Sequence, residues 1–175
     1  MVWTKKITIA GIAVLFIAAG AVMFFHSRQS SSAELSLDNT HSELPDVILK
    51  NSDGQDVRFS SMRGRLVVLY LWASWCERCI REISSHALLQ KEFGDALMFA
   101  EVNRGESLEV AKKYIDPNSG LLLFADGNDA LYKALGGFSM PETVFIDKDG
   151  IVRDHTRGPM SVIDLRRRIQ DSLAL

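Results

Sequence analysis

The stretch Trp72-Ala73-Ser74-Trp75-Cys76-Glu77-Arg78-Cys79 joins two segments with different periodicities. Before it, residues 66–71 form a continuous apolar run, which is typical of a strand buried on both faces. After it, apolar residues recur at three- and four-residue steps as far as Gly94, which predicts an amphipathic helix ended by that glycine. The two cysteines are therefore expected at a strand-to-helix junction, with Cys76 near the helix N-terminus and Cys79 one turn further along.

This placement suits thiol-disulfide exchange. Residues three apart on a helix are neighbours, so Cys76 and Cys79 can form a disulfide with little movement. The positive end of the helix dipole favours a thiolate, which is the attacking species, so Cys76 is the expected nucleophile and Cys79 the expected resolving thiol. The alternatives are a zinc half-site and two inert core cysteines. A zinc site needs about four ligands, and the four histidines are scattered singly, so we expect no metal.

The Trp-Ala-Ser-Trp-Cys-x-x-Cys sequence after an apolar strand resembles the thioredoxin superfamily. Residues 136–147, which contain Met140-Pro141-Glu142-Thr143, resemble the proline loop of that superfamily and the strand after it. Residues 44–59, with a turn signal at 51–54, resemble the hairpin that TlpA-like proteins and peroxiredoxins add at the N-terminus. Over residues 44–173 the chain resembles the membrane-anchored TlpA/ResA/CcmG (DsbE) group of thiol-disulfide oxidoreductases.

The resemblance implies an α/β fold, a thioredoxin-like three-layer sandwich with an added N-terminal β-hairpin, preceded by one transmembrane helix. It also implies a cis peptide bond between Met140 and Pro141. Trp75, Met140 and Pro141 are expected to bind an extended client segment, because the residue before the proline offers its backbone N–H and C=O. Two departures from the family pattern are Arg78, where proline is frequent, and Met140, where a small or β-branched residue is usual.

Several titratable side chains have more than one interpretation. Glu82 follows Cys79 by three residues and could exchange a proton with the buried thiol, a role that the resemblance favours, or it could be an exposed acid at the start of the helix. Glu142 is either a second carboxylate near the thiols or a solvated loop acid. His86 is expected on the helix surface, and His155 on the solvent face of the last strand.

Further elements follow from patterning. Helices are expected over residues 108–115, 126–135 and 161–173, and a last strand over 151–156 after a turn at 148–150. The alternation of strands and helices implies parallel crossovers.

The N-terminal segment indicates the compartment. Residues 7–25 are an apolar run near the length that spans a bilayer, and Lys5 and Lys6 before it place residues 1–6 in the cytoplasm. A cleaved signal peptide is the alternative. Residues 26–43 are expected to form a flexible tether, and 44–175 a thioredoxin-like domain on the periplasmic side of the bacterial inner membrane. The formal net charge of −2 gives no indication of nucleic-acid binding.

The function expected from the resemblance is reduction of apocytochrome c CxxCH cysteines, or of the haem-ligation machinery, by a monomer without cofactors. A membrane electron donor of the DsbD/CcdA type would re-reduce the Cys76–Cys79 disulfide. Three alternatives stay open: the same chemistry on another periplasmic client such as a copper-site protein, a peroxidase, and a Cu(I) chaperone that holds copper on two thiolates.

Overall fold

A computed structural model of the chain describes residues 41–174. The predicted anchor at 7–25 and nearly all of the predicted tether lie outside these residues. Within the described part, no helix is long and apolar enough to span a bilayer.

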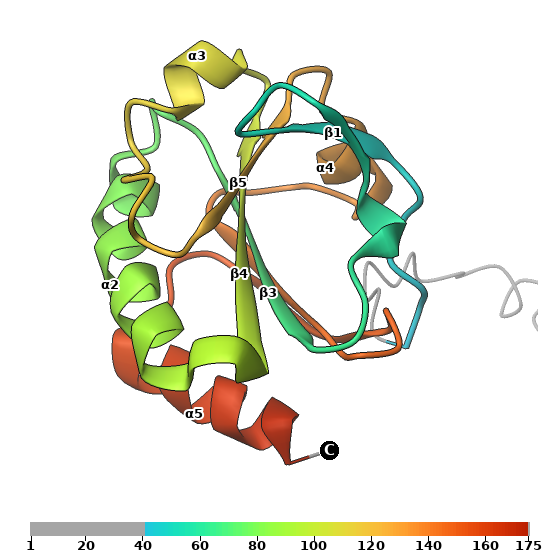
Figure 1. The fold of residues 1–175 in the computed structure, drawn as a ribbon, viewed down its shortest axis with the longest axis vertical. Helices are drawn as coiled ribbons and strands as arrows, with labels where there is room; N and C mark the ends of the chain where they lie inside the picture. Colours follow the sequence, from blue (N-terminus) through green and yellow to red (C-terminus); the bar gives the residue numbers. More distant parts are fainter. Residues whose placement is uncertain (1–40, 175) are drawn as a thin grey trace, which may run out of the picture. The chain divides into compact units, whose positions relative to one another are not determined.

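Seven strands form one sheet in the order β2-β1-β5-β4-β3-β6-β7 (Figure 1). Their bounds are β1 Ile48–Asn51, β2 Asp56–Arg58, β3 Leu66–Trp72, β4 Leu97–Arg104, β5 Leu122–Asp126, β6 Glu142–Ile146 and β7 Val152–Arg157. The three central strands β3, β4 and β5 are parallel, as the strand–helix alternation predicted, whereas β1, β6 and β7 run antiparallel to their neighbours.

Strand β3 supplies side chains to both hydrophobic cores. All seven of its residues are buried, as expected for the continuous apolar run. Tyr70 and Trp72 belong to one core, together with Cys79 and other residues of the helix after the active site. Leu69 and Leu71 belong to the core on the opposite face. This alternation follows from the two-residue period of a strand, and it places Tyr70 directly behind that helix.

Helices cover both faces of the sheet (Figure 1). The α-helices are α2 Glu77–Phe93, α3 Leu108–Ala111, α4 Ala130–Ala134 and α5 Val162–Leu173, and two 3₁₀ turns are η1 Phe59–Ser61 and η2 Gly94–Ala96. Helices α2 and α5 lie together on one face of the sheet, while α4 lies on the other. Gly94 ends α2 at a positive φ of 55°, as predicted.

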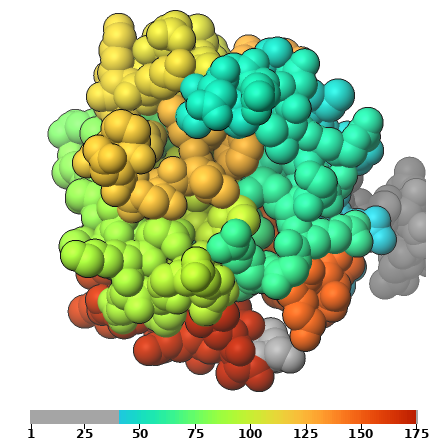
Figure 2. Space-filling view, viewed as in Figure 1, coloured from blue at the N-terminus to red at the C-terminus, as the bar shows by residue number. Residues whose placement is uncertain are grey.

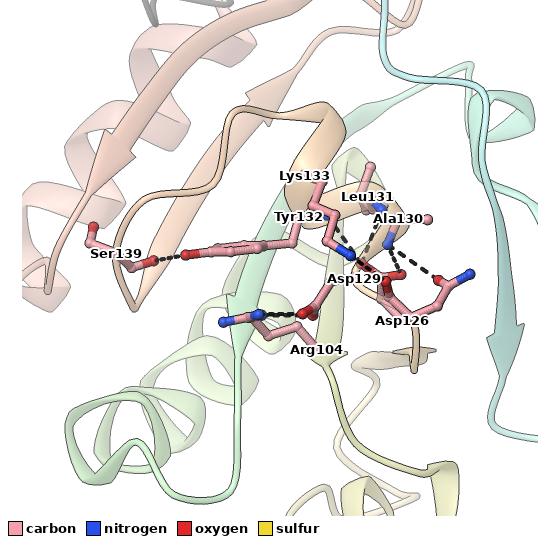
Figure 3. Close-up of polar contacts among 9 residues, drawn as sticks. Arg104, Asp126, Asp129, Ala130, Leu131, Tyr132, Lys133 and Ser139 are labelled. Atoms are coloured by element: carbon pink, nitrogen blue, oxygen red, sulfur yellow. Dashed lines mark hydrogen bonds and ion pairs between the residues drawn. The ribbon is translucent and has the colours of Figure 1, made fainter.

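Two predicted helices are shorter than expected. In the segment after α3, the backbone N–H groups of Lys113 and Tyr114 bond three residues back, so the predicted helix over 108–115 continues as tight turns. The predicted helix over 126–135 begins only at Ala130, because Asp126 ends β5. The Asp126 carboxylate accepts the backbone N–H groups of Ala130, Leu131 and Tyr132 (Figure 3), which supplies the acceptors for the first turn of α4.

The N-terminal hairpin is an integral part of the domain. Strand β1 pairs with the edge of β5, and in Figure 2 the hairpin (cyan) lies directly beside the segment that contains β5 (yellow to orange). The ring of Phe59 is fully buried and meets that of Phe124 edge-on, with 5.4 Å between centroids. Residues 41–44 also pair by backbone hydrogen bonds with residues 150–152.

Replacing Phe59 by alanine should lower the free energy of unfolding by about 3–5 kcal/mol, because it removes a fully buried ring and leaves a cavity between the hairpin and β5. Urea unfolding followed by tryptophan fluorescence would measure this. The matched control is Phe138→Ala, whose ring is 80% exposed and whose loss should cost no more than about 0.5 kcal/mol. Equal effects of the two substitutions would contradict the assignment of the hairpin to the core.

Candidate active site

Cys76 and Cys79 form a disulfide at the start of α2, where the sequence predicted it. Their sulfurs are 1.97 Å apart and their Cα atoms 5.3 Å apart. Cys76 is the N-cap residue of α2, and its sulfur accepts the backbone N–H of Cys79 at 3.3 Å. The first turn of a helix has N–H groups without helical partners, so this sulfur lies where a thiolate is stabilised by hydrogen bonding and by the helix dipole.

The two sulfurs differ in exposure. Cys79 is fully buried, whereas Cys76 is partly exposed. Trp75 is 66% exposed beside it, and Glu77 and Arg78 are also exposed. A client disulfide can therefore reach Cys76 but not Cys79, which fits the expected division between nucleophile and resolving thiol.

A carboxylate on the neighbouring chain segment holds the turn that presents Cys76. Glu106 accepts the backbone N–H of Ser74 at 2.7 Å and the Ser74 hydroxyl at 2.5 Å, and it also accepts the side-chain amide of Asn103 at 2.8 Å. Burial raises the pKa of Glu106, but the hydrogen bonds from Ser74 and Asn103 outweigh it and hold that pKa below its usual value. Glu106 is thus an anion that fixes the segment between β3 and α2.

Glu82 is half-buried and lies behind the disulfide. Its carboxylate accepts the hydroxyl of Tyr70 at 3.1 Å, and the same hydroxyl lies 3.4 Å from the backbone oxygen of Cys79. Burial is the largest effect on Glu82 and raises its pKa, although the Tyr70 hydrogen bond opposes this. The alternative of an exposed helix-start acid is therefore wrong. A carboxyl whose pKa is raised, and which shares the Tyr70 hydroxyl with the backbone of a buried cysteine, can take up and return a proton.

The proline loop lies beside the active-site turn. The Met140–Pro141 peptide bond is cis, as the resemblance implied. Glu142 pairs with Leu71 in the antiparallel β3–β6 ladder, so Pro141 and Met140 continue alongside the end of β3 where the active-site turn begins. Met140 packs against the same core as the side chain of Cys76.

Glu142 anchors this loop from inside. Its fully buried carboxylate accepts the backbone N–H groups of Phe138 and Ser139 at 3.0 and 3.1 Å, and it lies 3.0 Å from Nε2 of His155. Burial raises the pKa of Glu142, but these partners outweigh it and lower that pKa. A solvated loop acid is therefore excluded. The expectation of a solvent-facing His155 is also wrong, because its side chain is only 1% exposed. The side chain turns toward the buried Glu142 and not toward solvent.

A second contact braces the loop from α4 (Figure 3). The hydroxyl of Tyr132 donates to the backbone oxygen of Ser139 at 3.4 Å, one residue before Met140. The guanidinium of Arg104 lies 3.8 Å from the centroid of the Tyr132 ring, and it forms two hydrogen bonds with Asp129. The end of β4, the start of α4 and the proline loop are thus linked.

The expectation of a helix-surface His86 is wrong. His86 is 2% exposed, and its Nδ1 lies 2.7 Å from the fully buried Glu101 carboxylate of β4. Its ring stacks on Phe99 at 4.9 Å and meets the edge of Tyr70 at 4.4 Å. The prediction failed because a helix periodicity gives the face of a residue only approximately. It also could not reveal the partner Glu101, which lies on β4, fifteen residues away in the sequence.

Four residues of the site were not identified as such from the sequence: Tyr70, His86, Glu101 and Glu106. Signals for two of them exist. A glutamate in the middle of the otherwise apolar run 97–102 indicates a buried partner, and a tyrosine within 66–71 has a hydroxyl that needs one when buried. The bond between Glu106 and Ser74 joins positions 32 residues apart and has no local signature.

The fold and this site define a thioredoxin-like thiol-disulfide oxidoreductase: a Cys-x-x-Cys disulfide at a helix N-terminus beside a cis-proline loop. The chain belongs to the AhpC/TSA family, whose profile matches residues 40–155.

Individual relatives agree with this assignment. The chain is 30% identical over 135 residues to the thiol-disulfide oxidoreductase ResA of Geobacillus thermodenitrificans, which covers 74% of this chain and 75% of that protein. It is 25% identical over 166 residues to the thiol:disulfide interchange protein DsbE of Allochromatium vinosum, covering 91% and 89%. Among solved structures, dsbF from MTB superposes with a TM-score of 0.65 at 26% identity, over 72% of this chain and 94% of the other.

Replacing Glu106 by alanine should lower the free energy of unfolding by about 3 kcal/mol, since hydrogen bonds to a charged group contribute about 1.5–3 kcal/mol each and this group is only partly buried. The folded-state pKa of Glu106 is lowered, so its contribution is fully present above the unfolded-state pKa of about 4.3 and is lost as the pH falls through the lower folded value. Urea unfolding of both proteins between pH 7 and pH 3 would show the difference shrinking. The control is Glu109→Ala, which removes an exposed acid three residues later and should change the free energy of unfolding by no more than about 0.5 kcal/mol. A loss of stability equal to that of Glu106→Ala would contradict the role of Glu106.

Proposed function

We propose that this protein is a membrane-tethered reductant that acts on extracytoplasmic client disulfides. The observation that carries the proposal is the pairing of an accessible Cys76 with a buried Cys79, whose carbonyl shares the Tyr70 hydroxyl with Glu82. This arrangement supplies a nucleophile, a resolving thiol and a proton acceptor in one place.

The first step uses the exposed sulfur. In the reduced protein, the Cys76 thiolate attacks one sulfur of a client disulfide, forming a mixed disulfide while the other client sulfur leaves with the electron pair and takes a proton from solvent. The helix N-terminus and the Cys79 N–H stabilise the Cys76 thiolate, and the exposed guanidinium of Arg78 adds positive charge nearby.

The second step uses the buried sulfur. Cys79 gives its thiol proton to the Glu82 carboxylate, and the resulting thiolate attacks the Cys76 sulfur. The bond between Cys76 and the client breaks, the Cys76–Cys79 disulfide forms, and the client sulfur leaves with the electron pair and is protonated. Burial of a thiol disfavours its charged form, so a nearby acceptor such as Glu82 is needed for this step to be fast.

The client lies across the proline loop. Trp75 is exposed and Met140 is half-exposed, and both offer apolar surface near Cys76. The backbone of Ser139, the residue before Met140, is held by Glu142 and Tyr132. An extended polypeptide can pair with backbone groups at this point, because the proline lacks an N–H and ends the β6 ladder there.

The client class we favour is the CxxCH segment of apocytochromes c, or the haem-ligation machinery that handles it. The support is the similarity to proteins named ResA and DsbE, together with the apolar segment at 7–25 after Lys5 and Lys6. Reduction of CxxCH cysteines must precede haem attachment, so a reductant is useful in an oxidising compartment. A membrane donor of the DsbD/CcdA type would return the electrons, and the protein would act as a monomer in the bacterial inner membrane.

The reduction potential of the Cys76–Cys79 couple should be near or below that of thioredoxin, about −270 mV. Equilibration of the chain in glutathione or dithiothreitol buffers, read by alkylation of the thiols, would measure it. A potential near that of DsbA, about −120 mV, would identify an oxidant and exclude the reductant. Tight stoichiometric binding of Cu(I) without exchange activity would instead support a copper chaperone.

A Cys79→Ala variant should accumulate a mixed disulfide with an oxidised CxxCH peptide, because Cys76 can attack but nothing displaces the client. Mass spectrometry of the acid-quenched reaction would detect the adduct on Cys76. The Cys76→Ala variant should form no adduct within the same time, since Cys79 is fully buried. Adduct formation through Cys79 alone would reverse the assignment of nucleophile and resolving thiol.

A further inference from the structure

The contact between His86 and Glu101 is a buried polar pair that the exchange steps above leave without a role. Both side chains are almost completely buried, at 2% and 0% exposure. One carboxylate oxygen, Oε1, lies 2.7 Å from Nδ1 of His86, while Oε2 has no hydrogen-bond partner among the described residues. Replacing a buried ion pair by apolar residues is often neutral or stabilising, so stability alone does not explain this one.

The pair lies directly behind the proton acceptor of the resolving step. His86 follows Glu82 by four residues on α2, so the two side chains share one face of the helix. The His86 ring meets the edge of the Tyr70 ring at 4.4 Å, and the Tyr70 hydroxyl donates to Glu82. A continuous set of contacts therefore runs from Cys79 through Tyr70 and Glu82 to His86 and Glu101.

Four groups from three elements and one loop act on the Glu82 carboxylate: the Tyr70 hydroxyl of β3, His86 of α2, Glu101 of β4, and the backbone N–H of Met160 in the loop before α5. Burial is the main cause that raises the pKa of Glu82. A positive charge on His86 lowers that pKa, and the negative charge of Glu101 raises it by a smaller amount. With a positive charge on His86, the pair therefore stabilises the Glu82 anion.

We propose that the His86–Glu101 pair is a positioning element for the resolving step, and that its charges govern how readily Glu82 takes the Cys79 proton. The inference rests on the proposed function, because it concerns the same exchange reaction. It assigns to two residues outside the Cys-x-x-Cys segment a part in setting the pH range of catalysis.

Ellman's reagent separates the two steps. The Cys76 thiolate attacks the reagent, releases one thionitrobenzoate and keeps the other as a mixed disulfide. Cys79 then gives its proton to Glu82, attacks Cys76 and releases the second thionitrobenzoate, leaving the Cys76–Cys79 disulfide. Stopped-flow absorbance of the reduced full-length chain between pH 5 and pH 9 gives both rates, and the second reports ionisation of Cys79.

The expected result is a shift confined to the second release. If the pair carries charge as proposed, Glu101→Gln leaves the buried imidazole without its counter-charge, which favours the neutral ring, so Glu82 loses the cation that stabilises its anion. His86→Asn keeps a hydrogen-bond donor toward Glu101 but removes the charge. Both variants should move the pH midpoint of the second release upward, and a shift of one pH unit slows that release about tenfold below the midpoint. The first release should be unchanged.

Controls separate charge from packing. Leu89→Ala removes a buried side chain on the next turn of α2 without changing any charge, so it should lower the melting temperature but leave the midpoint in place. The double variant His86→Leu/Glu101→Met removes both charges in an apolar form that is expected to fold even if a single variant does not, and it should shift the midpoint as Glu101→Gln does. A midpoint unchanged in the double variant, or shifted equally by Leu89→Ala, would overturn the proposal.

The Glu82→Gln variant distinguishes this proposal from the proposed function. If Glu82→Gln slows the second release and His86→Asn adds nothing in that background, the pair acts through Glu82 as proposed. If Glu82→Gln slows it while the pair variants do not, only the present inference fails. If the wild-type protein gives no second release at all, the proposed exchange reaction fails, and this inference fails with it.

Discussion

The position of the active site depends on β3, a central strand that is buried along its whole length. Its parallel pairing with β4 sets Trp72 opposite Asn103, which brings the following turn within reach of Glu106. Its antiparallel pairing with β6 brings Pro141 alongside the same turn. Three segments that are distant in sequence therefore meet at one end of one strand. A register shift of one residue in either ladder would turn side chains to the opposite face and separate them.

The carboxylates around the disulfide divide into two kinds according to the donors that surround them. Glu106 and Glu142 each have three hydrogen-bond partners among backbone and side-chain groups, and the pKa of each is lowered. Glu82 has the Tyr70 hydroxyl and one backbone N–H, too few to compensate for its burial, so its pKa is raised. The first two are anions that hold loops in place, and Glu82 is the one of the three carboxylates whose pKa is shifted toward proton uptake.

The sequence was sufficient for the features that are local or periodic. The buried strand, the cysteines at the start of α2 and the Gly94 stop were predicted from such patterns, whereas the cis-proline loop was predicted only from the family resemblance. The errors concern side chains whose partners are far away in the chain: His86 pairs with Glu101, and His155 pairs with Glu142. Helix and strand periods give the face of a residue, but whether a histidine on that face is solvated depends on the charged group opposite. Asp126 is a different case, because its carboxylate accepts backbone N–H groups only four to six residues later, at the start of α4.

Tyr70 connects the acid–base chemistry of Glu82 to the backbone of the second cysteine. Burial raises the pKa of Tyr70 far above neutral pH, so its hydroxyl stays protonated. It has one proton and two acceptors within reach, the Glu82 carboxylate at 3.1 Å and the Cys79 carbonyl at 3.4 Å. Ionised Glu82 attracts that proton more strongly, whereas protonated Glu82 can itself donate to the tyrosine oxygen and leave its proton for the carbonyl. Proton transfer from the Cys79 thiol to Glu82 would thus strengthen the hydrogen bond that holds Cys79 in place as its sulfur attacks.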